Sequence, residues 1–356
     1  MKASGIRVRR AWLLVSVVAI AASAQTPPVA GASAQTPPVA ESSDTTIRVN
    51  VQLVRILATV KDATGALVGG LDKDAFSITD NGVPQEISVF ERQTSQPLSV
   101  AILIDTSGST AIDLPYETGS VMRFAHALLR EGNPSDAVAL FSFNWEIVKQ
   151  RGFTRNPGQI EKALRGLRGE AGTSLYDAIL LASRDIEDRQ GRKVLVVVTD
   201  GGDTTSRSDF NRAVEAAQLA DAVIFPILVM PITNDAGRNI GGENALATMA
   251  LRTGGRVFNP SPGAALDRAF DEIIQSLRTQ YLLAFYPKNV APTPDRFHTL
   301  RVTVTDPKLQ VAARSGYYGE ARQEDAPAPA GVGVQPSDTT MRGRKPVRDT
   351  KNTKGP

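Results

Sequence analysis

The stretch that decides the fold is Leu98-Ser-Val-Ala-Ile-Leu-Ile-Asp105-Thr-Ser-Gly-Ser109. From Leu98 to Ile104 it is apolar apart from one serine, without the alternation of a strand that has one face in water. An unbroken apolar run of this length indicates a strand that is buried on both faces of a largely parallel sheet. Polar residues follow at once, so oxygen-bearing side chains are expected where this strand ends.

The same rhythm of buried strand and amphipathic helix continues along the chain. Further unbroken apolar runs lie at 137–143, 194–198 and 222–229. Apolar residues recur at helical spacing near 112–130, 174–189, 208–220 and 264–278. Alternating strands and helices predict a doubly wound, mostly parallel α/β domain over residues 97–280.

The segments on either side of this domain have β patterning. In 46–96 the apolar residues alternate, and Asp80-Asn81-Gly82 is a strong hairpin signal between strands at 76–79 and 86–90. In 281–319 strands are expected at 281–286, 300–304 and 309–313. Neither segment alone could bury both faces of a sheet, so we predict one small β-sandwich built from both, with about seven strands. The competing placement puts Tyr281–Phe285 at the edge of the α/β sheet.

Both ends of the chain predict segments outside these domains. Residues 1–24 have the order of a secretory signal peptide, with Lys2 and three arginines before an apolar run and then Ala22-Ser23-Ala24. The apolar run is short for a membrane span, which needs about 20 residues. Residues 25–45 belong to a repeated Pro-rich linker, and 320–356 form a basic tail predicted to be disordered. We therefore predict an exported protein, periplasmic or secreted, with no transmembrane segment after signal cleavage.

Composition narrows the classes of partner. The chain is 42% hydrophobic and 22% charged, as in soluble globular proteins. Four of its 40 basic residues lie in the signal segment, which leaves 36 against 37 acidic residues. A nearly neutral mature chain gives no reason to expect nucleic-acid binding. The sequence has no cysteine, so its stability must come from its core rather than from disulfides.

A set of oxygen-bearing side chains follows the buried strands. Asp105, Ser107 and Ser109 alternate after the first strand, Thr173 precedes a helix, and Asp200 ends the apolar run at 194–198. In an open α/β sheet the carboxyl ends of parallel strands share one edge, where ligands bind. Hard oxygens that converge there suit Mg²⁺ or another hard divalent cation.

These residues resemble the von Willebrand factor A domain family and its metal-ion-dependent adhesion site, over about residues 97–280. The matching positions are Asp105-x-Ser107-x-Ser109, then Gly172-Thr173, then Thr199-Asp200-Gly201. The resemblance implies that Ser107 and Ser109 bind the metal directly, that Thr173 does so in one state, and that Asp105 and Asp200 act directly or through water. It also implies Mg²⁺, or Mn²⁺ or Ca²⁺, and a protein partner that supplies an acidic side chain. The flanking segments resemble bacterial members of the family that carry signal peptides.

The resulting prediction is an exported, non-enzymatic module for metal-dependent protein binding or adhesion. The first alternative is a structural or assembly factor of the cell envelope, in which the metal site is an internal latch. The second is a metal-dependent hydrolase, which the sequence favours least because its only histidines, His126 and His298, are expected in packing or surface positions. Some of the polar residues could also be structural: Ser174-x-x-Asp177 matches a capping box, and Asp113 and Asp203 lie outside the family pattern.

Overall fold

The computed structural model describes residues 53–92, 96–108, 110, 114–229, 239–261, 263–319 and 340–342. The expected signal segment, the repeated linker and most of the basic tail lie outside these ranges. None of the helices in the described ranges is both long and apolar enough to cross a membrane.

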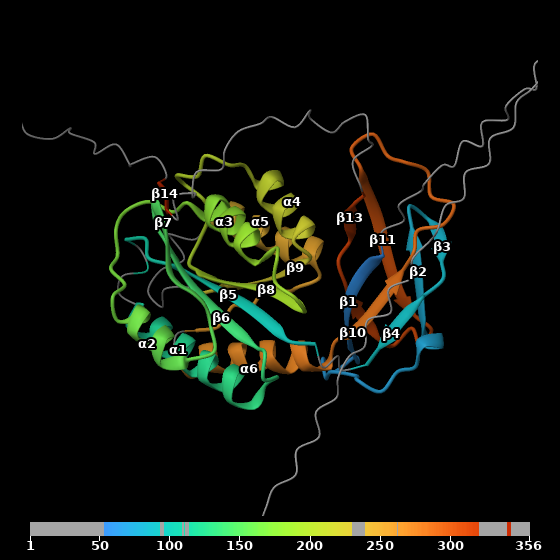
Figure 1. Ribbon diagram of the computed structural model, residues 1–356, viewed down its shortest axis with the longest axis horizontal. Coiled ribbons are helices and arrows are strands. Elements are labelled where there is room, and N and C mark those ends of the chain that lie inside the picture. Colours follow the sequence, from blue (N-terminus) through green and yellow to red (C-terminus); the bar gives the residue numbers. More distant parts are fainter. Residues whose placement is uncertain are drawn as a thin grey trace, which may run out of the picture. The chain divides into compact units, whose positions relative to one another are not determined.

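The α/β part contains one six-stranded sheet in the order β14-β7-β6-β5-β8-β9 (Figure 1). Four strands are parallel: β5 (Leu98–Asp105), β6 (Ala137–Phe143), β8 (Arg192–Thr199) and β9 (Ala222–Leu228). Antiparallel to β6 runs β7 (Glu146–Thr154), and antiparallel to β7 runs β14 (Thr340–Arg342). Because β5 lies between β6 and β8, the winding reverses at the carboxyl end of β5, which is where open α/β sheets bind ligands.

Helices cover both faces of this sheet, which explains why the central residues of the parallel strands are mostly apolar (Figure 1). One face packs against α1 (Leu114–Glu131), α2 (Pro157–Leu164) and α6 (Ala264–Thr279). The other packs against α3 (Leu175–Ile186), α4 (Phe210–Leu219) and α5 (Ile240–Thr253). The predicted doubly wound α/β fold is confirmed.

The second part of the chain is a β-sandwich of two four-stranded antiparallel sheets. One sheet has the order β12-β1-β10-β4, with β12 at Gln310–Ala312, β1 at Val54–Lys61, β10 at Tyr281–Phe285 and β4 at Val89–Glu91. The other has the order β13-β11-β2-β3, with β13 at Gly316–Tyr318, β11 at Phe297–Val304, β2 at Phe76–Asp80 and β3 at Val83–Gln85. A single 3₁₀ turn, η1 (Lys73–Ala75), precedes β2. As the fold prediction requires, the sheets combine strands from before and after the α/β domain.

Strand β10 decides between the two placements that the sequence left open. It pairs with β1 on one side, where Val54 lies opposite Phe285, and with β4 on the other. Tyr281–Phe285 is therefore a central strand of the sandwich and not an edge strand of the α/β sheet. All five of its residues are buried, because strands flank it on both sides and the second sheet covers its inner face.

The hairpin is confirmed, and three other local features differ from the expected pattern. The predicted hairpin forms, with positive φ at both Asn81 (47°) and Gly82 (82°), as a two-residue type I′ turn requires. The strand expected at 86–90 forms only at its end, in β4, whereas β3 at Val83–Gln85 completes the hairpin and belongs to the other sheet. The helices α2 and α5 and the strand β7 were not expected. Within the tail predicted to be disordered, β14 forms a strand, because its backbone pairs with the edge of β7.

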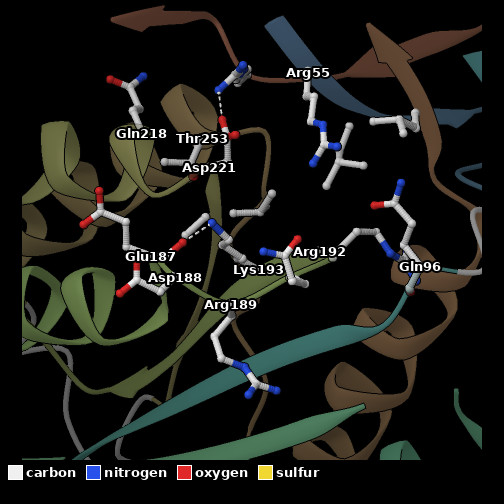
Figure 2. A pocket seen from close by; sticks show the side chains of 17 residues that line it. Arg55, Gln96, Glu187, Asp188, Arg189, Arg192, Lys193, Gln218, Asp221 and Thr253 are labelled. Carbon is white, nitrogen blue, oxygen red and sulfur yellow. Dashed lines mark hydrogen bonds and ion pairs between the residues drawn. The ribbon is translucent and has the colours of Figure 1, made fainter. Parts of the chain in front are cut away.

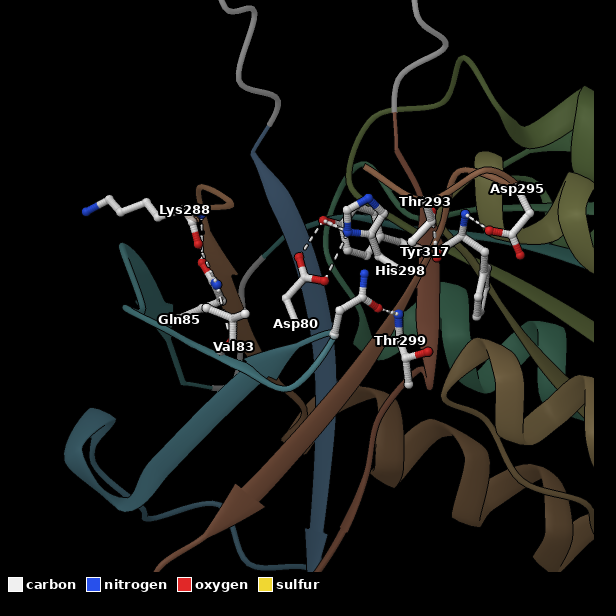
Figure 3. A network of polar contacts seen from close by, with 11 residues as sticks. Asp80, Val83, Gln85, Lys288, Thr293, Asp295, His298, Thr299 and Tyr317 are labelled. Atoms are coloured by element: carbon white, nitrogen blue, oxygen red, sulfur yellow. Dashed lines mark hydrogen bonds and ion pairs between the residues drawn. The ribbon is translucent and has the colours of Figure 1, made fainter. Parts of the chain in front are cut away.

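A buried polar network closes one end of the sandwich (Figure 3). The fully buried Asp80 carboxylate accepts a hydrogen bond from the Tyr317 hydroxyl at 2.7 Å and lies 3.0 Å from His298 Nδ1. The imidazole of His298 stacks on the Tyr317 ring, with 4.8 Å between centroids. His298 thus has the packing role expected for it, since it connects β11 to β2 and β13.

Candidate metal site

Asp105 is the last residue of β5, and its carboxylate is fully buried. One oxygen accepts the backbone N–H of Ser107 at 2.8 Å, and the other accepts the hydroxyl of Thr199 at 2.6 Å. Thr199 ends β8, the neighbouring strand, so the bond spans two strand ends at the winding reversal. Two donors, one in the loop after β5 and one at the end of β8, therefore fix the orientation of this carboxylate.

The electrostatics of Asp105 fit a cation. Burial raises the pKa of its carboxyl to about 7; the Thr199 hydroxyl lowers that pKa, and the negative charge of Asp200 raises it. Among the described residues, no basic side chain contributes to this shift. Two carboxylates that repel each other at one sheet edge are the arrangement that a divalent cation would neutralise. The donor set, carboxylates with hydroxyls, is the one that Mg²⁺ prefers.

Thr173 lies on a loop that backbone hydrogen bonds tie to this edge. Its N–H donates to the Thr204 hydroxyl at 2.9 Å, and its carbonyl accepts the Thr204 N–H at 2.8 Å. The next residue, Ser174, donates its N–H to the carbonyl of Asn144 at 2.7 Å. The Thr173 hydroxyl itself makes no hydrogen bond within the described part of the chain, so it remains available to a ligand.

The structure thus places Asp105, Ser107, Thr173 and Asp200 at the carboxyl edge of the sheet. Ser109 and Asp113 lie outside the described residues. Over the described ranges, no three His, Cys, Asp or Glu side chains are grouped as metal ligands, so a site here relies on two carboxylates supplemented by hydroxyls. That these residues hold a metal stays a prediction.

The sequence suggested that Ser174 and Asp177 form a capping box at the start of α3, and this prediction is wrong. Ser174 does begin α3, but its side chain makes no capping bond there and instead lies 2.8 Å from the Thr205 hydroxyl. The Asp177 carboxylate accepts the N–H groups of Arg207 and Ser208 at 2.8 and 2.9 Å. Both residues therefore hold the loop after β8 against α3. Asp203 acts similarly and accepts the N–H of Tyr176 at 3.2 Å.

The sequence did not reveal several residues that position the site. Thr199 was visible only as a neighbour of Asp200 in the match Thr199-Asp200-Gly201, and its hydrogen bond to Asp105 was not expected. Asn144, Thr106 and Thr204 could not be found, since each lies far along the chain from its partner: Asn144 bonds Thr106 across 38 positions. The order of strands had to be known before these loops could be placed side by side.

Gly202 and Gly242 bring the loop after Asp200 against the first turn of α5. A Cβ atom at Gly242 would lie 2.3 Å from the Cα of Gly202 and 2.5 Å from its nitrogen, both of them backbone atoms. We expect Gly242→Ala to lower the free energy of unfolding by about 1–3 kcal/mol, because the two backbones must separate. At Gly241, the nearest atom would be 3.4 Å away, so Gly241→Ala is the matched control. Urea unfolding of both variants checks this; equal midpoints would contradict it.

Comparisons with known proteins agree with this architecture. Residues 100–202 match the family model of the von Willebrand factor type A domain. An uncharacterized protein of Mycobacterium tuberculosis is 32% identical over 133 residues, which is 36% of this chain and 18% of that protein, and a Mycobacterium bovis protein matches equally. This chain thus spans 18% of the length of these curated relatives.

Two solved structures align with part of this chain at low sequence identity. The von Willebrand factor domain of a type V pili tip protein from Porphyromonas gingivalis aligns at a TM-score of 0.43 and 17% identity, covering 52% of this chain and 96% of that one. An aerotolerance-related membrane protein from Bacteroides fragilis aligns at 0.39 and 20%, covering 51% and 98%. The family match at residues 100–202 includes Asp105, Thr173 and Asp200. Residues 100–202, which lie within the α/β part of this chain, thus match the von Willebrand factor type A domain family.

Proposed function

We propose that this chain binds a partner protein through a divalent cation at the carboxyl edge of its α/β sheet and catalyses no reaction. The observation that carries the proposal is the buried Asp105 carboxylate, which has Asp200 as a second carboxylate nearby and no basic partner among the described residues. Burying a carboxylate without a compensating charge is costly, so a cation at this position would stabilise the site.

The residues that would hold the ion are Asp105, Ser107, Ser109, Thr173 and Asp200. Mg²⁺ is the first candidate, with Mn²⁺ or Ca²⁺ as alternatives, because all donors are hard oxygens. When bound, a dication whose nearest ligands are hydroxyls and water stays electrophilic and attracts a carboxylate from outside. Thr199 and the Ser107 N–H would keep the Asp105 carboxylate in place while that ligand enters. The partner would then supply an Asp or Glu side chain.

Capture from a cell-envelope fraction tests this function directly. Wild-type protein with Mg²⁺ should retain a partner that a chelator releases, and Asp105→Asn should fail to retain it. Asp203→Asn is the control, because that residue lies at the same edge but outside the ligand set. A captured set that does not change with chelator would contradict metal-dependent binding and favour the internal latch.

The order of the first 24 residues supports export, and processing can be measured. We expect cleavage after Ala24, with Ala34 as a second possible position, because the Ala-x-Ala signature occurs at both. Intact-mass measurement of the periplasmic or secreted protein gives the result. A mature chain that still begins with Met1 would contradict export through a cleaved signal.

A further inference from the structure

A cavity of about 370 Å³ lies at the amino ends of the parallel strands, opposite to the edge that carries Asp105 (Figure 2). Its walls come from both parts of the chain. The sandwich contributes Arg55 and Leu57 of β1 and Leu282 of β10, while Arg192 and Lys193 begin β8 on the α/β side. Cavities that hold small organic ligands have volumes of about 300 to 1,000 Å³.

The lining of this cavity has an excess of positive charge. Five basic side chains line it against three acidic ones. Of the five, Arg314 is paired with Asp221 at 2.7 Å, and Arg189 donates to Ser99 and lies over the Phe153 ring. The other three are Arg55, Arg192 and Lys193. Within the described residues, none of these three forms an ion pair.

Arg192 is the most unusual of the three. The residue is only 5% exposed, and its guanidinium donates to the backbone carbonyls of Leu277 and Gln96 rather than to a carboxylate. Its Nε has no hydrogen-bond partner. Burial lowers the pKa of Arg192 to about 10, and the negative charge of Asp136 offsets this lowering only in part. Because no carboxylate contacts the guanidinium directly, a bound anion would add to this compensation.

Lys193 and Arg55 approach the same space from different strands. The Lys193 ammonium donates to the carbonyl of Glu187, which leaves two of its three donors unused. Burial lowers its pKa, with Asp221 and Glu187 acting in the opposite direction and Arg55 adding to the lowering. Arg55 and Lys193 line the same cavity from β1 and β8, so an anion between them could contact both.

We propose that this cavity binds a small organic anion, whose phosphate or carboxylate group contacts Arg55, Lys193 and the buried edge of Arg192. The apolar part of the ligand would lie against Leu57, Leu282 and Val223, which line the same cavity. Arginine and lysine recognise phosphate and carboxylate oxygens through the same charge-assisted hydrogen bonds, so one site can serve both groups. This site is separate from the metal edge and does not depend on the proposed metal.

Calorimetric titration with four probes tests the proposal: phenyl phosphate, benzoate, inorganic phosphate and the neutral benzyl alcohol. At fixed ionic strength we expect one of the two aromatic anions to bind about tenfold more tightly than inorganic phosphate, and benzyl alcohol not to bind. Whether phenyl phosphate or benzoate binds more tightly identifies the acidic group. Arg55→Ala and Lys193→Ala should each weaken the preferred probe about tenfold, since each removes a charge-assisted contact.

Arg301→Ala removes the same charge from an exposed position on β11, away from the cavity, and should leave probe binding unchanged. Asp105→Asn should leave it unchanged as well. The proposal is overturned if neither aromatic anion binds at 10 mM, or if Arg301→Ala weakens binding as much as Lys193→Ala does. Binding that survives in both Arg55→Ala and Lys193→Ala would also overturn it.

Discussion

Asp105→Asn should weaken Mg²⁺ binding by about 10- to 100-fold and leave the fold intact. Asparagine has nearly the same shape as aspartate, so it can keep one hydrogen bond, to the Ser107 N–H or to Thr199. The substitution removes the negative charge that would balance the dication. Because this carboxylate is fully buried, water cannot replace that charge. Calorimetric titration with Mg²⁺ and Mn²⁺ on wild type and variant measures the effect.

The effects of substituting the other proposed ligands on metal affinity should follow the charge that each substitution removes. Asp200→Asn removes the second carboxylate and should have an effect close to that of Asp105→Asn. Thr173→Ala removes a neutral hydroxyl and should have a smaller effect. Asp203→Asn should change metal affinity by less than about twofold, since its carboxylate accepts the backbone N–H groups of Tyr176 in α3 and of Ser206 instead. If Asp203→Asn weakens metal binding as much as Asp105→Asn does, the loss of affinity comes from the lower negative charge of this edge and not from the loss of a metal ligand.

The wild-type titration decides the proposed function itself. An acidic peptide is included in one arm, because it can fill the coordination position that a partner would occupy. If the wild type binds no divalent ion at millimolar concentration even with this peptide, the adhesion-site hypothesis is wrong. The latch hypothesis then fails with it, because both need a bound metal.

Tyr281→Ala should lower the free energy of unfolding by about 3–5 kcal/mol, the range found for large buried side chains. Tyr281 is fully buried, and its ring packs against Phe76 and Phe90 with centroid distances of 4.9 and 6.1 Å. Its hydroxyl accepts the N–H of Leu71 at 2.9 Å and donates to the carbonyl of Val68 at 2.8 Å. The residue thus joins the β10 strand to the segment between β1 and β2.

Two further variants separate the contributions of the ring and the hydroxyl. Tyr281→Phe keeps the ring and should cost about 1–3 kcal/mol, because two backbone groups lose their partner. Tyr286→Ala lies just after the same strand at a position that is 45% exposed and should stay within about 0.5 kcal/mol of wild type. Urea unfolding measures all three. If Tyr281→Ala lowers the free energy of unfolding no more than Tyr286→Ala does, the packing of β10 does not stabilise the sandwich core.

The parts of the structure that the sequence determines by itself are local ones. The apolar run at 98–104 and its polar continuation predict β5 and Asp105 correctly, since burial on both faces leaves no other pattern for such a strand. Asn81-Gly82 determines the hairpin turn, because both positions need positive φ. The residues of the candidate site could be named because they lie at or near the end of a buried strand or the start of a helix.

What could not be predicted depends on which distant segments meet. The strand β7 alternates only weakly and contains three charged residues, so its place beside β6 depends on the sheet that receives it. The Thr199 bond to Asp105 spans 94 positions and exists only because β8 is the neighbour of β5. The short helix α2 likewise has too few turns for a clear periodic signal.

The sandwich and the basic cavity also depend on contacts between segments that lie far apart in the chain. Strand patterns on both sides of the α/β domain were visible, but a buried run such as Tyr281–Phe285 could have joined either sheet. Only tertiary structure placed it between β1 and β4, where both of its edges and both of its faces are covered. The cavity of Arg55, Arg192 and Lys193 was invisible in the sequence, because Arg55 stands more than 130 positions from the other two. Side-chain periodicity and turn geometry act over a few residues, whereas strand neighbours and cavity walls are decided by which apolar surfaces bury each other across the whole chain.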